Sequence, residues 1–81
     1  MAGILIYQIG HKYFSLISTD NEIYDYIKKE LVKDNYCKII WEKGNVPLEK
    51  IENARKIKEE FIEKLNLGEN INLKGLESFF T

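Results

Sequence analysis

Residues 4–18, ILIYQIGHKYFSLIS, hold two apolar runs on either side of Gly10-His11. A glycine-X pair between such runs predicts a β-hairpin closed by a two-residue type II′ turn. This turn would place Tyr7 opposite Phe14. One face of the hairpin would then carry Leu5, Tyr7, Ile9, Phe14 and Leu16. We expect this face to cover the core, because its cross-strand pairs are the largest and the most uniformly apolar.

A helix and a third strand are predicted after the hairpin. Thr19-Asp20-Asn21-Glu22 fits a capping box, whose threonine would cap a helix from about Asp20 to Lys33. The alternating residues from Tyr36 to Glu42 predict a strand, and residues 43–45 predict a turn after it. The inward face of this strand would carry Cys37, Ile39 and Trp41.

Pro47, a favoured first-turn residue, opens a second predicted helix, which Asn66-Leu67-Gly68 would end. Its stripe consists of Leu48, Ile51, Ala54, Ile57 or Lys58, Phe61, Ile62 and Leu65. Residues 69–81 are too apolar for a solvated terminus. We expect them to cover part of the second hairpin face, with another copy of the chain or a partner covering the rest. That face carries Ile4, Ile6 and Ile17.

This order of hairpin, helix, strand, helix and short C-terminal segment predicts an α+β fold. Three strands would form a small, mainly antiparallel sheet with helices packed on one face, giving two layers. A length of 81 residues leaves room for one domain, which we assign to residues 1–81. A chain this short buries a modest core, so a homodimer or a partner protein would add to its stability.

Residues that build reactive sites are scarce. The 81 residues include one histidine, one cysteine and one arginine. Metal centres and most nucleophilic sites need clusters of such side chains, so we predict no catalytic residue, no metal and no cofactor. Neither G-x-x-x-x-G-K-[ST] nor G-x-G-x-x-G occurs, which argues against a glycine-rich phosphate loop. The expectation is a non-enzymatic protein.

The net charge and the lengths of the apolar runs indicate the partners and the cellular compartment to expect. The net charge is −1, without the basic excess of a typical nucleic-acid binder. No apolar stretch is long enough to span a bilayer, and Gly3–Ile9 lacks the basic region of a secretory signal. Together with the unpaired Cys37, this favours the reducing cytoplasm. Lysine far outnumbers arginine, which suggests an AT-rich genome such as that of a low-GC bacterium or its phage.

Aromatic residues are frequent, at 12% of the chain. Some fall outside the predicted core stripes, and exposed tyrosines favour protein interfaces, because they bury a large area at a low entropic cost. The candidate protein-binding residues are Tyr13, Tyr26, Phe79 and Phe80. The leading hypothesis is a small protein that binds and modulates another protein, such as a phage or mobile-element inhibitor, an antitoxin or an immunity protein.

Nucleic-acid binding is the alternative hypothesis. Lysines near the end of the first helix and in the third strand could lie beside aromatic side chains, which is the composition of a surface for RNA or single-stranded DNA. The candidate residues are Lys28, Lys29, Lys33, Tyr36, Lys38 and Trp41. Acidic residues are interleaved among them, so ordinary surface charge is the favoured interpretation of these lysines.

Overall fold

The computed structural model describes residues 2–78. In chain order its elements are β1 (Ala2–Ile9), β2 (Lys12–Ser18), α1 (Asn21–Lys33), β3 (Cys37–Val46), the short 3-10 helix η1 (Leu48–Lys50), α2 (Ile51–Asn66) and α3 (Lys74–Glu77). The strand order is β2-β1-β3, and both pairings are antiparallel. The predicted α+β fold with an antiparallel three-stranded sheet is therefore confirmed.

The hairpin of β1 and β2 has the predicted register. Ile9 pairs with Lys12, and Tyr7 pairs with Phe14. Gly10 has a φ of 61°, whereas His11 does not have a positive φ. A positive φ at the first turn residue alone is the pattern of a type II′ turn. The turn chemistry read from the sequence therefore fixes the pairing of these two strands.

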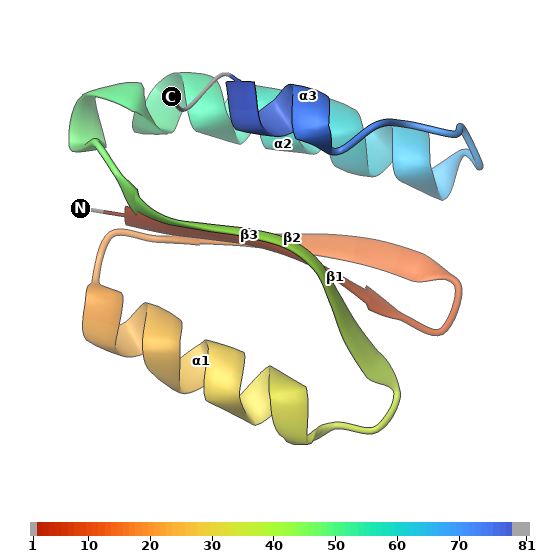
Figure 1. Cartoon of the computed structure of the whole chain (residues 1–81), viewed down its shortest axis with the longest axis horizontal. Coiled ribbons are helices and arrows are strands. Elements are labelled where there is room, and N and C mark those ends of the chain that lie inside the picture. The colour runs from red at the N-terminus through yellow and green to blue at the C-terminus, as the bar shows by residue number, and fades with distance from the viewer. Residues whose placement is uncertain (1, 79–81) are drawn as a thin grey trace.

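Helices cover both faces of the sheet, with α2 and α3 on one face and α1 on the other (Figure 1). Side chains alternate along β1, so Ile4 and Ile6 face α2 and α3, while Gly3 faces Tyr24 of α1. Residues 2–6 are buried without interruption, as expected of a strand that is covered on both sides. The single helical layer expected from the sequence is corrected to two, one on each face of the sheet.

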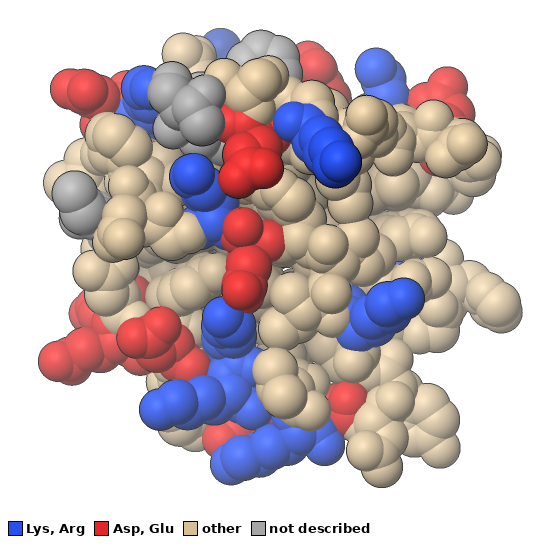
Figure 2. Space-filling model, viewed as in Figure 1, with Lys and Arg blue, Asp and Glu red and all other residues tan. Residues whose placement is uncertain are grey.

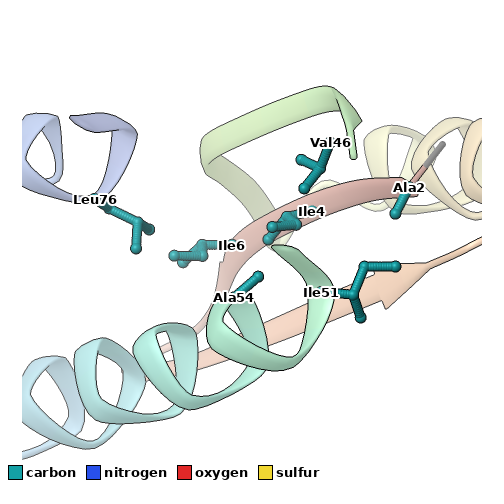
Figure 3. Close-up of a cluster of buried hydrophobic side chains, with 7 residues drawn as sticks. All are labelled: Ala2, Ile4, Ile6, Val46, Ile51, Ala54 and Leu76. Atoms are coloured by element: carbon teal, nitrogen blue, oxygen red, sulfur yellow. The ribbon is translucent and has the colours of Figure 1, made fainter. Parts of the chain in front are cut away.

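The main core cluster lies between the sheet and the layer of α2 and α3 (Figure 3). It consists of Ala2, Ile4, Ile6, Val46, Ile51, Ala54 and Leu76. Leu76 is fully buried, and Leu73 packs against the same cluster, so the C-terminal segment covers this face as expected. The sequence had favoured the opposite face, where Leu5 is fully buried but Ile9 and Phe14 remain partly exposed. Both faces therefore contribute to the core, and the main cluster lies on the face that was not favoured, because side-chain size does not determine which face the helices cover.

β3 contains a β-bulge that the alternating pattern concealed. Ile6 of β1 pairs with Trp41, and the next residue, Tyr7, pairs with Ile39, so Ile40 is an extra residue. The bulge moves Trp41 to the face of Ile6, where Trp41 and Ile40 both pack against the main cluster. The prediction that Trp41 shares a face with Ile39 was therefore wrong.

β3 also continues where a turn was predicted. The strand runs through residues 43–45 to Val46, with a second register shift opposite the segment between Ala2 and Ile4. Asn45 has a φ of 59°. Asparagine tolerates this left-handed conformation better than most residues, and a bulge accommodates it without ending the strand.

Asp20, rather than the predicted Thr19, caps α1. Its Oδ1 accepts hydrogen bonds from the backbone N–H groups of Glu22, at 2.9 Å, and Ile23, at 3.3 Å. The Ser18 hydroxyl in turn accepts the Asp20 N–H at 3.2 Å. The negative charge of a carboxylate at this position also interacts favourably with the positive end of the helix dipole, which stabilises the helix. The predicted boundaries of the helix hold to within a residue.

Candidate protein-binding surface

α1 leaves the turn end of its sheet face incompletely covered. The helix lies closest to the sheet at its N-terminal end, where Tyr24 packs on Gly3, and diverges toward its C-terminal end (Figure 1). Toward the hairpin turn, Ile9 is 38% exposed and Phe14 is 39% exposed. The least covered part of this face is thus apolar and lies beside the turn.

We call the surface formed by Tyr7, Ile9 and Phe14 the hairpin face. Tyr7 and Phe14 are cross-strand partners, and their rings stack with 5.6 Å between centroids and 21° between planes. A stacked aromatic pair adds about 0.5–1.5 kcal/mol beyond its buried area, so the sheet holds these rings in place. Lys12 pairs with Ile9 and is exposed, which places a cation at the margin of this face.

More apolar side chains are exposed on α1 and in the loop after it. Tyr26 is 66% exposed and Tyr36 is 82% exposed, and Ile23 and Val32 of α1 are more than half exposed. A shallow groove on the outer side of α1 is lined only by residues within 25–33. Because one helix supplies all of its lining, this groove is a feature of the surface and not an enclosed cavity.

Two of the four predicted protein-binding residues, Tyr13 and Tyr26, lie among the described residues. Tyr26 lies on the exposed side of α1, as expected. Tyr13 is half-buried in β2, and both of its backbone polar groups are bonded to the side chain of Asn66. Phe79 and Phe80 lie outside the described residues. The sequence assigned Ile9 and Phe14 to the core, so it missed the hairpin face; their position next to the turn was the one signal that could have identified it.

The six residues of the predicted nucleic-acid surface do not all lie on one side of the sheet. The Lys28 Nζ lies 2.6 Å from a Glu42 carboxylate oxygen, and the Lys33 Nζ lies 3.2 Å from that of Glu30. Trp41 packs against the main cluster, on the opposite side of the sheet from the α1 lysines. Lys29, Tyr36 and Lys38 are exposed. The bulge in β3 therefore places the tryptophan on the opposite side of the sheet from the lysines of α1.

Among residues 2–78, the surroundings of three titratable groups shift their pKa values. Burial raises the pKa of the Tyr24 hydroxyl, and the negative charge of Glu42 raises it further. The hydrogen bond to Glu42 is the main cause that raises the pKa of Lys28. Burial also raises the pKa of the Cys37 thiol, to which Asp34 adds. A raised pKa keeps this thiol protonated, which is the opposite of what an activated nucleophile requires.

Within residues 2–78, no group of three or more histidine, cysteine, aspartate or glutamate side chains is placed to hold a metal ion. The same residues contain no helix long and apolar enough to cross a membrane. Comparison of the chain with protein-family models, with curated proteins and with solved structures found no match. The inference of function therefore rests on the surface of the molecule itself.

Proposed function

We propose that this protein is a small non-enzymatic modulator that binds another protein through the hairpin face. The observation that carries the proposal is the partial exposure of Ile9 and Phe14 beside the fixed ring of Tyr7. Interface energy concentrates in a few aromatic and apolar anchors that become fully buried on binding. The stacked pair is an anchor of this kind, because the sheet has already restricted its side-chain freedom before a partner arrives.

The biological class that fits this proposal is a small inhibitor, antitoxin or immunity protein, encoded by a phage or another mobile element and acting in the cytoplasm. Proteins of this class act by occupying a surface of their target, so they need an anchor and no reactive centre. The balanced charge of the chain supports protein binding over nucleic-acid binding, since phosphate recognition depends on a concentration of lysine and arginine.

The test is capture from a lysate of the cells that the protein comes from, with and without nuclease treatment. The wild-type bait is compared with a variant that carries Ile9→Ala and Phe14→Ala. A matched control carries Leu48→Ala, since this leucine is 59% exposed and lies in η1, at the end of the molecule away from the hairpin turn (Figure 1). We expect the wild-type and control baits to retain the same protein and the hairpin-face variant to lose it. Equal capture by all three baits, or capture that nuclease abolishes, contradicts the proposal.

A further inference from the structure

The hairpin register determines which backbone groups of β2 point away from the sheet. Hydrogen-bonded pairs alternate along an antiparallel ladder, and in a two-residue hairpin the closing pair, Ile9 and Lys12, is one of them. Tyr13 must therefore turn its N–H and C=O away from β1. The Asn66 side chain meets both groups: its Oδ1 accepts the Tyr13 N–H at 2.8 Å, and its Nδ2 donates to the Tyr13 carbonyl at 3.1 Å.

Ser15 and Ile17 follow Tyr13 in steps of two, so their N–H and C=O groups point to the same outer edge. Among the described residues, no hydrogen bond joins these four groups to another part of the chain. The register of β2 is regular from Ser18 to Lys12. A straight edge with unpaired backbone groups is the geometry that accepts an additional strand.

The other edge of the sheet, formed by β3, is less suited to strand addition. Its two register shifts interrupt the spacing of the backbone groups. Ion pairs also connect this strand to both helical layers, through Lys28 with Glu42 and Lys43 with Glu77. Figure 2 shows basic and acidic side chains alternating across this side of the molecule, from the α2 and α3 layer down to α1.

We propose that the edge of β2 from Ser15 to Ile17 binds an extended segment of another protein as a fourth strand. This inference rests on the proposed function and specifies the form of the partner. On the α1 side, the added strand would lie beside Phe14 and Leu16, which requires apolar side chains. On the α2 side it would lie near Lys58, whose Nζ donates to the Ser15 hydroxyl at 2.9 Å.

The charge near this edge selects an acidic partner. Within residues 2–78, no carboxylate lies within ion-pair distance of Lys58. The segment that fits therefore alternates apolar residues, facing Phe14 and Leu16, with acidic residues, facing Lys58. A second copy of β2 fits less well, because in a full antiparallel register around Ser15 its Ile17 would need the place that Asn66 occupies. β2 also offers no acidic side chain to Lys58.

The test begins with selection of random displayed peptides on the immobilised full-length protein. We expect the enriched sequences to alternate acidic and apolar residues. A synthetic peptide of the enriched sequence, at saturation, should slow hydrogen exchange of the Ser15 and Ile17 amides by about tenfold or more. A version that is N-methylated at the amides facing β2 should not bind. The proposal is overturned by failure to enrich any peptide, by enrichment without this alternation, or by equal binding of the methylated version.

Two substitutions at one position provide a matched comparison. Ser15→Pro removes the outward N–H, and an edge strand tolerates proline where the N–H faces solvent. Ser15→Ala keeps this N–H and removes only the hydroxyl that contacts Lys58. Ser15→Pro should abolish peptide binding, and Ser15→Ala should change the Kd by less than about threefold. If lysate capture depends on Phe14 but is unaffected by Ser15→Pro, the edge proposal fails while the proposed function stands. If no Phe14-dependent capture occurs, the proposed function fails.

Discussion

The ring of Tyr24 lies directly against the backbone of Gly3, and its hydroxyl donates to the carbonyl of Ile4 at 3.3 Å. A Cβ atom at Gly3 would lie 2.6 Å from the ring. This close approach sets the position of the N-terminal end of α1 over β1. The same contact explains why the helix covers one end of the sheet better than the other.

Gly3→Ala should therefore destabilise the protein. The added methyl group must displace a buried ring, and overpacking of this kind typically costs about 1–3 kcal/mol. In a domain of this size, this cost corresponds to a decrease in Tm of about 4–8 °C for each kcal/mol. Gly44→Ala is the control, because a Cβ atom there meets nothing within 4 Å. An unchanged Tm for Gly3→Ala in thermal unfolding would show that Tyr24 does not pack as described.

Leu76 and Leu67 test the role of the C-terminal segment. Leu76 is fully buried in the main cluster, whereas Leu67 is 74% exposed. Leu76→Ala should cost about 2–5 kcal/mol, because it leaves a cavity in the main cluster. Leu67→Ala should cost less than about 0.5 kcal/mol. Urea unfolding, followed through the fluorescence of the partly buried Trp41, measures both. Similar midpoints for the two variants would mean that α3 does not close the core.

Stability should decrease at alkaline pH. The folded protein raises the pKa of Tyr24, Lys28 and Cys37, so it holds these protons more tightly than the unfolded chain does. The stability that these groups contribute is present below their unfolded pKa values, about 8.5–10.4, and is lost as the pH rises through the higher folded values. Tyr24→Phe should make the free energy of unfolding fall less steeply with rising pH, and should lower it by about 0.5–1.5 kcal/mol at neutral pH. Urea titrations at several pH values across this range measure the free energy of unfolding. A wild-type value that does not change with pH would contradict the prediction.

Asn66→Ala should expose the whole edge of β2. The variant loses both hydrogen bonds to Tyr13, and the freed backbone groups extend the open edge toward the turn. We expect it to self-associate through paired β2 strands, which sedimentation velocity detects as a dimer or larger species that the wild-type protein does not form at the same concentration. Asn53→Ala, at an exposed position of α2, is the control. A monomeric Asn66→Ala variant would show that Asn66 does not protect the edge.

Local chemistry made much of the fold predictable from the sequence. Gly10-His11 determined the hairpin register, and the breaks around Asp34 and Pro47 separated the remaining elements. Contacts between segments that are distant in the sequence were harder to predict. The extra residue Ile40 leaves the alternation of apolar residues intact in the sequence while reversing the face of Trp41.

The candidate site was harder to predict than the fold. Tyr26 was correctly expected to be exposed, because its place outside the apolar stripe of the helix is a local property. The exposure of Ile9 and Phe14 depends on how α1 diverges from the sheet, and this depends on the contact between Tyr24 and Gly3. No pattern within the hairpin encodes that contact. The pairing of Asn66 with Tyr13 joins residues 53 positions apart and left no local signal either.

Photocrosslinking from the hairpin face tests the central claim most directly. A photoreactive phenylalanine analogue replaces Phe14 in one bait and Leu48 in a second, and both are irradiated in nuclease-treated lysate. The account predicts a discrete protein adduct from position 14 and none from position 48, since Phe14 belongs to the proposed interface and Leu48 lies in η1, away from it. Equal adducts from both positions, or an adduct from position 48 alone, would contradict it.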